Sequence, residues 1–417
     1  MTAGQDGGLG HAAAEAVARH SYGKLVAFLA ARTRDVAAAE DALADAFAAA
    51  LADWPAHGVP QKPEAWLLAV ARRKAVDAAR RRRTSQDAAG ELRMLTEELA
   101  SAASAAEIPD ERLSLMFACA HPAIDAGIRA PLVLQTILGF DAAAIASAFL
   151  VAPSTMGQRL VRAKQKIALA GIPFRLPERA DLPERLDAVL EAIYATFTEG
   201  WADPIGTETR RRNLAEEGIW LGRLVASLLP QEAEALGLLS LMLYAEARRP
   251  ARRDPQGEFV PLGEQDTSHW NADLIAEAES LLRMASAKGA LGRYQLEAAI
   301  QSAHVVRRLA GRADWAAIEH LYDALFALTQ SPVVAINRAV AIAETRGAAA
   351  GMAALDALSK DHRLADYQPY WAARAGLLAR AGAVEQADRA YELAIGLESD
   401  PAVRRFLEQR RAAVKAR

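Results

Sequence analysis

Residues 141–167, DAAAIASAFLVAPSTMGQRLVRAKQKI, decide how this chain is interpreted. They predict a short apolar helix, a tight turn and a second helix with polar and cationic positions, which is the pattern of a helix-turn-helix. Pro153 suits the first turn of the second helix, because the N–H that it lacks would have no partner there. The expected apolar core of the motif is Ile145, Phe149, Val151, Met156 and Leu160. This pattern indicates DNA binding.

The second helix of this motif presents two kinds of side chain for DNA. Short polar residues and an arginine near its start can reach base edges, while the cations further along suit phosphates. The first set is Ser154, Thr155, Gln158 and Arg159, and the second is Arg162, Lys164 and Lys166.

An independent basic helix is expected upstream, over residues 63–83. Residues 71–83 hold seven cations and one anion, a density that a polyanion would neutralise with release of counterions. The alternative is a solvated helix end whose cations the helix dipole favours, which explains residues 80–83 better than residues 72–74. The candidate DNA contacts are Arg72, Arg73, Lys74, Arg80 and Arg83.

The segment WPAHGVPQKP, residues 54–63, predicts a rigid loop before that helix, because its prolines cannot continue a helix. Trp54, His57 and Lys62 are candidates for holding an unstacked base beside the basic helix. The alternative, that Trp54 is a core anchor, is equally compatible with the sequence.

Composition favours an all-α protein. Hydrophobic residues make up 52% of the 417, much of this share is alanine, and the net charge is −3. The one cysteine excludes a disulfide framework and a cysteine-based zinc site. No apolar stretch approaches the roughly 20 residues of a membrane span, and no signal peptide is evident, so we expect a cytoplasmic protein. We expect no cofactor and no metal.

The carboxy-terminal part reads as helical, with a repeat near its end. Its large and small positions match the spacing of a tetratricopeptide repeat at Trp371, Ala375, Leu378, Gly382, Ala387, Tyr391 and Ala394, with a poorer copy starting near Pro332. Generic packing of antiparallel helices is the alternative. The polar string EQDTSHWN, residues 264–271, is expected to pack the tail against itself or the preceding domains through Trp270.

Several segments together resemble one family, the extracytoplasmic-function (ECF) class of sigma-seventy-type factors, in its long-tailed group with a tetratricopeptide-like extension. Residues 38–51, AAEDALADAFAAAL, are similar to region 2.2, and residues 63–83 resemble regions 2.3–2.4. The helix-turn-helix resembles region 4.2. The tail segments LDAVLEAIYATFTEGW, EEGIWLGRLVASLLP, LGLLSLMLYAEARR and DYQPYWAARAGLLARAG also resemble this group.

The resemblance implies an architecture and a set of partners. Residues 13–84 would form sigma region 2, 85–107 a linker, 108–172 the helix-turn-helix of sigma region 4, and 180–417 a helical regulatory extension. Region 2 would bind the β′ clamp helices of core RNA polymerase through Glu40, Asp41 and Asp45, and read the minus-ten element of promoter DNA. Region 4 would meet the β flap and read the minus-thirty-five element. The extension would have a protein partner or an intramolecular contact.

Two other classes of function are weighed against this interpretation. A helix-turn-helix regulator with a ligand- or protein-sensing helical domain would bind duplex operators without polymerase. An enzyme or metal protein would use polar clusters such as Glu264, Asp266, His269 and Asp273, but their spacing fits no familiar ligand set. We therefore expect a protein that is not an enzyme.

Overall fold

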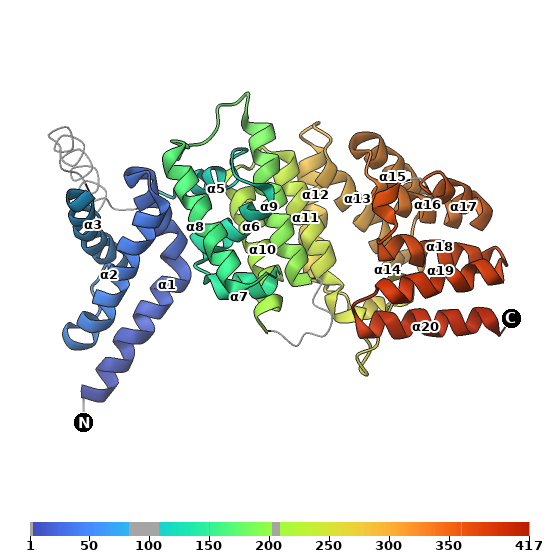
Figure 1. Ribbon diagram of the computed structural model, residues 1–417, viewed down its shortest axis with the longest axis horizontal. Coiled ribbons are helices and arrows are strands. Elements are labelled where there is room, and N and C mark those ends of the chain that lie inside the picture. Colours follow the sequence, from blue (N-terminus) through green and yellow to red (C-terminus); the bar gives the residue numbers. More distant parts are fainter. Residues whose placement is uncertain (1–2, 83–107, 150, 202–208, 360, 417) are drawn as a thin grey trace. The chain divides into compact units, whose positions relative to one another are not determined.

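The computed structural model describes residues 3–82, 108–149, 151–201, 209–359 and 361–416 (Figure 1). Within these ranges the regular elements are helices, and the one isolated β-bridge pairs Arg253 with Phe259. The prediction of an all-α protein is confirmed. The chain divides into two compact units: unit 1 comprises residues 1–200 and 213–218, and unit 2 comprises 201–212 and 219–417.

Unit 1 begins with three helices, α1 (Ala3–Thr33), α2 (Val36–His57) and α3 (Pro63–Arg82). The carboxylate of Asp35 starts α2 by accepting a hydrogen bond from the backbone N–H of Ala38 at 3.0 Å. Alanines recur along the buried side of α2 and allow close approach of its neighbours. Its buried side chains also include Leu43 and Trp54, which gives this helical group an apolar centre.

The predicted break at residue 54 is wrong, because α2 continues through Pro55 and ends at His57, with Gly58 as its cap. The Trp54 side chain is 1% exposed, and its ring packs edge-on against Trp66 with centroids 5.6 Å apart. Burying the indole is worth more than the one backbone hydrogen bond that Pro55 cannot donate. The positive φ of Gly58, 85°, then turns the chain toward α3.

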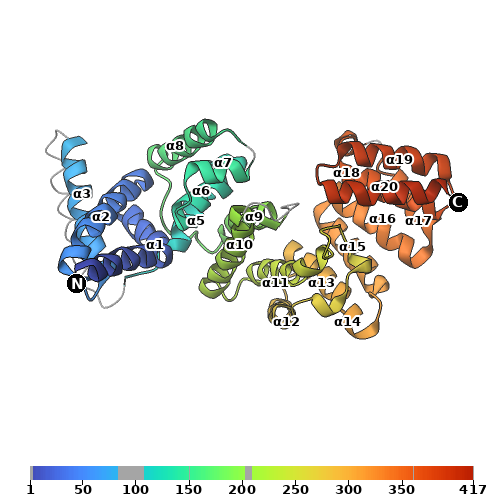
Figure 2. The ribbon, with the colours of Figure 1, turned by 90° about the horizontal axis from the view of Figure 1, so that it is seen from below.

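Four shorter helices follow: α5 (Arg112–Cys119), α6 (Ala126–Leu138), α7 (Ala142–Ala148) and α8 (Pro153–Leu169). Helices α7 and α8 are consecutive and pack on each other where the helix-turn-helix is predicted, and Ile145, Met156 and Leu160 are buried there. The assignment of this pair to the helix-turn-helix class stays a prediction. Pro153 occupies the first helical position of α8, as expected. Figure 2 shows these helices grouped together.

Helix α9 (Leu182–Trp201) belongs largely to unit 1, although the sequence placed the start of the tail near residue 180. The guanidinium of Arg185 donates to the carbonyl of Phe117 in α5 at 2.7 Å. Helix α10 (Thr209–Leu228) approaches α9 so closely that a Cβ at Gly218 would lie 2.9 Å from the Cα of Phe197. These contacts join the first turns of the expected tail to unit 1.

Unit 2 is a series of helices that pack on their sequence neighbours (Figure 2). The 3₁₀ segments η1 (Arg249–Arg252), η2 (Leu262–Glu264), η3 (Thr267–His269) and η4 (His362–Leu364) interrupt it. Its α-helices are α11 (Ala233–Ala247), α12 (Ala272–Ser286), α13 (Arg293–Val305), α14 (Arg307–Ala310), α15 (Trp315–Thr329), α16 (Pro332–Arg346), α17 (Ala348–Asp356), α18 (Gln368–Arg380), α19 (Val384–Leu397) and α20 (Pro401–Lys415).

The positions predicted for a repeat share one core. Ala375, Leu378, Ala387, Tyr391 and Ala394 belong to a single buried cluster of α18, α19 and α20, and Trp371 packs on its edge. Gly382 turns the chain between α18 and α19 with φ 78°. Successive helix hairpins of this kind agree with the predicted pattern, while the assignment to the tetratricopeptide class stays a prediction.

Candidate nucleic-acid and polymerase interface

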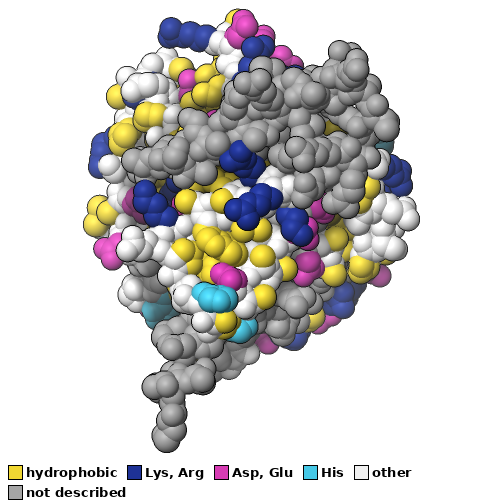
Figure 3. Space-filling model, turned by 90° about the vertical axis from the view of Figure 1, so that its left-hand side faces the viewer, with side chains coloured by type: hydrophobic (Ala, Val, Ile, Leu, Met, Phe, Trp, Pro, Cys, Tyr) yellow, Lys and Arg dark blue, Asp and Glu magenta, His cyan; other side chains and the backbone are white. Residues whose placement is uncertain are grey.

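Helix α3 separates an apolar side from a cationic one. Leu67, Ala71 and Ala75 are buried, whereas Arg73 and Lys74 are exposed. Arg72 is half-buried. Arg80 lies in α3, where the structure does not describe its side chain, and Arg83 lies outside the described residues. Figure 3 shows Lys and Arg side chains gathered across the middle of one face of the molecule, beside hydrophobic ones.

Two of the three residues that the sequence predicted in a loop before α3 are exposed. Lys62 is exposed, and His57 is exposed with its Nδ1 2.9 Å from a carboxylate oxygen of Asp53. Trp54 is different: its buried indole cannot stack on a base in this structure, so the core-anchor alternative holds for this residue. Its burial follows from its place in the last turn of α2.

Helix α8 presents the predicted DNA-reading face to solvent. Ser154, Thr155, Gln158, Arg159 and Arg162 are all exposed. The guanidinium of Arg162 lies 3.4 Å from the side-chain oxygen of Gln158, one turn away. Lys166 is exposed as well, and the described part of α8 carries no acidic side chain. The opposite side of the helix carries Met156, Leu160, Ala163 and Ile167, which are buried.

Lys164 departs from its predicted role as a phosphate contact. It lies on the buried side of α8, four residues after Leu160, and its ammonium forms an ion pair with the carboxylate of Glu40 in α2. The two side chains are only 10% and 14% exposed. In this structure Lys164 therefore joins α8 to α2 and is not available to DNA.

The acidic side of α2 is partly open. Asp41 and Asp45 are exposed, and Asp45 lies 3.5 Å from the ammonium of Lys74 in α3. The two side chains are 50% and 58% exposed, so the pair is weak and a partner protein can displace it. These two carboxylates keep their predicted availability to another protein.

Glu40 does not keep that availability, because its carboxylate is covered. Burial raises the pKa of Glu40, and the ammonium of Lys164 counters only part of that effect. Its Oε2 pairs with Lys164, while its buried Oε1 has no hydrogen-bond partner among the described residues. Use of Glu40 as a polymerase contact would require separation of α8 from α2.

Sequence reasoning missed this pairing although a signal for it was present. The spacing of Leu160, Lys164 and Ile167 places the lysine on the apolar side of an amphipathic helix. A cation on that side implies a buried acidic partner, which helical spacing alone cannot identify because Glu40 lies 124 residues away.

The polar segment of the tail packs within unit 2. The Trp270 side chain is 4% exposed, and its Nε1 donates to the side-chain oxygen of Gln265 at 3.2 Å. Glu264 pairs with Arg410, and the Asp266 carboxylate accepts from the backbone N–H of Ser268 at 2.8 Å. Of the two packing alternatives for Trp270, the structure shows contact of the tail with itself.

Neither a metal site nor a membrane span is found in the described ranges. They contain no group of three or more His, Cys, Asp or Glu residues able to hold a metal ion. No helix among them is both long and apolar enough to cross a bilayer.

Comparison with known proteins assigns the first helices and part of the tail. Residues 17–85 match the family model of sigma-70 region 2, and residues 185–286 match a family of unknown function (DUF6596). An uncharacterised protein of Rhizobium meliloti (strain 1021) is 38% identical over 372 residues, which cover 88% of each chain. No solved structure matches the chain.

Proposed function

The chain belongs to one family with that Rhizobium protein and has a sigma-70 region 2 at its amino-terminal end, and on this premise we propose that it directs promoter-specific initiation by core RNA polymerase. In this proposal it is a sigma factor of the ECF class, and α5 to α8 serve as its region 4. The observation that carries the proposal is the region 2 match over helices whose exposed side chains include both cations and carboxylates.

Each helix has a distinct task in the proposal. Asp41 and Asp45 of α2 meet the β′ clamp helices of the polymerase. Arg73 and Lys74 of α3, with Lys62 and His57 before it, hold the opened minus-ten strand electrostatically.

Helix α8 reads the upstream promoter element as duplex. Its Arg159 and Gln158 lie near the amino-terminal end of a helix that suits the major groove, and Arg162 follows toward the phosphates. Two weak readers on one chain bind a promoter with the avidity of linked sites and select its spacing. The β flap of the polymerase contacts the same region of the chain.

The helices of unit 2 act as an in-chain regulator in this proposal. Their successive hairpins resemble the surfaces on which helical repeat proteins bind other proteins. We propose either a protein partner for these helices or a contact with the sigma domains.

The decisive experiment is promoter-specific transcription in vitro by core enzyme with the full chain. Arg73→Ala and Arg159→Ala should each reduce the specific transcript, and Asp41→Ala should weaken co-elution with core polymerase. Arg308→Ala removes an exposed cation of unit 2 and serves as the matched control. Specific DNA binding without any association with core polymerase would instead establish a classical helix-turn-helix regulator.

A further inference from the structure

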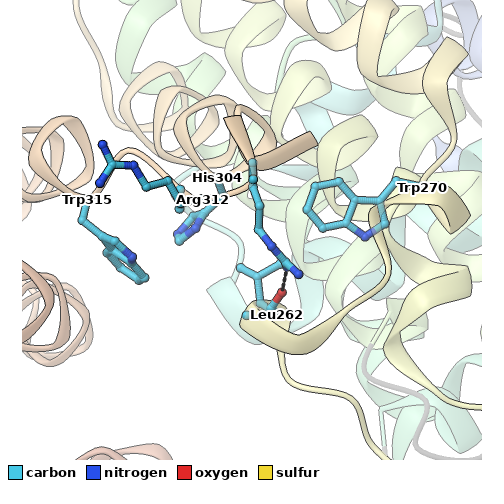
Figure 4. Close-up of a pocket in the computed structure, with 9 residues that line it drawn as sticks. Leu262, Trp270, His304, Arg312 and Trp315 are labelled. Carbon is cyan, nitrogen blue, oxygen red and sulfur yellow. Dashed lines mark hydrogen bonds between the residues drawn. The ribbon is translucent and has the colours of Figure 1, made fainter. Parts of the chain in front are cut away.

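Unit 2 contains a cavity of about 270 Å³ between the segment before α12 and the turn that joins α13 to α15. This volume is near the lower end of the range of small-molecule sites, roughly 300 Å³. Figure 4 shows Trp315 and Arg312 at one end, Trp270 at the other, and His304 between them. None of the tasks proposed above uses this cavity.

Three aromatic side chains form its walls, and each is held in place. The hydrogen bond from Trp270 to Gln265 fixes the first indole. The rings of His304 and Trp315 meet edge-on, with centroids 5.3 Å apart and planes at 89°. Because burial, aided by Arg248, lowers the pKa of His304 to about 4, its imidazole is neutral at pH 7. Such fixed, uncharged aromatic walls suit a flat apolar ligand.

The electrostatics of the cavity favour an anion. Arg307 and Arg312 line it, and no acidic residue does. Arg307 is engaged, since its two terminal nitrogens donate to the carbonyls of Leu262 and Gln265 at 2.7 and 2.8 Å. Arg312 is exposed, and no partner for its guanidinium is found within the described ranges.

A further positive charge is buried nearby. Arg248 is 8% exposed and donates to the carbonyl of Tyr244 and the side-chain oxygen of Gln301, which are both neutral acceptors. The described residues give it no carboxylate partner. A buried positive charge favours the entry of an anion, because its surroundings screen the charge poorly.

We propose that this cavity binds a small aromatic carboxylate, with its ring between Trp270 and Trp315 and its carboxylate on Arg312. Arginine binds a carboxylate through two parallel hydrogen bonds and also stacks on aromatic rings, so both parts of such a ligand are recognised. The proposal is independent of the sigma function, since it concerns residues of unit 2 alone.

Calorimetric titration of the purified full chain with indole-3-acetate tests this proposal, and indole-3-acetamide is the uncharged probe of the same shape. We expect the acid to bind at least about tenfold more tightly than the amide, which is the effect of one added charge-assisted contact. Arg312→Ala should remove this preference. Arg308→Ala deletes a neighbouring arginine that is also exposed but does not line the cavity, and it should leave the preference intact.

Circular dichroism verifies that both arginine variants are folded, and the comparison of acid with amide needs no variant. Absence of acid binding at millimolar concentration would overturn the proposal. Equal binding of acid and amide would do so too, as would an equal loss in the two arginine variants.

Discussion

At the scale of single residues, the ion pair between α8 and α2 has the largest consequences for the packing of unit 1. Lys164 and Glu40 come from α8 and α2, and their pairing holds the expected DNA-reading helix against the expected polymerase-binding helix. A largely buried carboxylate that loses its cation is costly, because its surroundings solvate the remaining charge poorly. The strength of this contact therefore bears on how readily the two helices separate.

Replacement of Lys164 by methionine should destabilise the packing of α8 on α2 by about 3 kcal/mol at neutral pH, as expected for one partner removed from a buried pair. Hydrogen exchange of α8 amides in the full chain measures this as a smaller free energy of opening. The double variant Lys164→Met with Glu40→Gln should recover most of the loss, because no buried charge remains. A single variant with unchanged exchange would show that the pair is energetically neutral.

His304 should make unit 2 sensitive to acid. The pKa of this histidine falls from 6.5 to about 4 on folding, so the unfolded chain binds the proton more readily. The contribution of neutral His304 to the free energy of unfolding is fully present above pH 6.5 and is lost as the pH falls toward 4. The loss is about 3 kcal/mol, at 1.4 kcal/mol for each pKa unit.

Urea unfolding followed by tryptophan fluorescence at neutral and acid pH measures that loss. His304→Phe keeps an aromatic ring against Trp315 and should abolish this part of the pH dependence. His320→Phe changes an exposed histidine and should retain it. An identical pH dependence in wild type and His304→Phe would refute the assignment.

At the scale of elements, one glycine sets the approach of α1 to α6. A Cβ at Gly23 would clash with the carbonyl oxygen of Ile137, which is backbone and cannot turn aside. Gly23→Ala should therefore destabilise unit 1, although alanine is the better helix former. Gly157→Ala in α8 is the control: a Cβ there meets nothing within 4 Å, so a gain of about 1 kcal/mol is expected. Thermal unfolding of the two variants should shift in opposite directions.

The sequence predicted elements well where a periodic pattern or a single residue type determines them. The helical spacing of apolar residues located α8, and Pro153 located its start. The prolines wrongly predicted that the helix breaks at residue 54, because the burial of the Trp54 indole outweighed the one hydrogen bond that Pro55 cannot donate. The prediction for Lys164 was wrong for another reason: its pairing with Glu40 depends on tertiary packing, which local sequence patterns do not contain.

At the scale of the whole molecule, unit 1 extends to residue 200 and includes residues 213–218, whereas the sequence predicted that the tail begins at residue 180. Helix α9 buries Leu186, Val189, Ile193 and Phe197, and Arg185 binds the carbonyl of Phe117. A chain that ended near residue 176 would lack these side chains. Because each large apolar side chain contributes about 1.5–3 kcal/mol on full burial, that loss is comparable to the stability of a small domain.

A chain that ends at Pro230 should consequently keep unit 1 folded, while a chain that ends at Leu176 should unfold at a lower temperature. The longer chain retains α9 and the whole of α10, including Gly218 against Phe197. Circular dichroism on heating measures both midpoints, and the full chain provides the reference. Equal midpoints for the two shortened chains would show that α9 contributes nothing to unit 1. The expected difference means that a transcription comparison made to isolate the effect of unit 2 should use the longer chain, because a cut at Leu176 removes part of unit 1 as well.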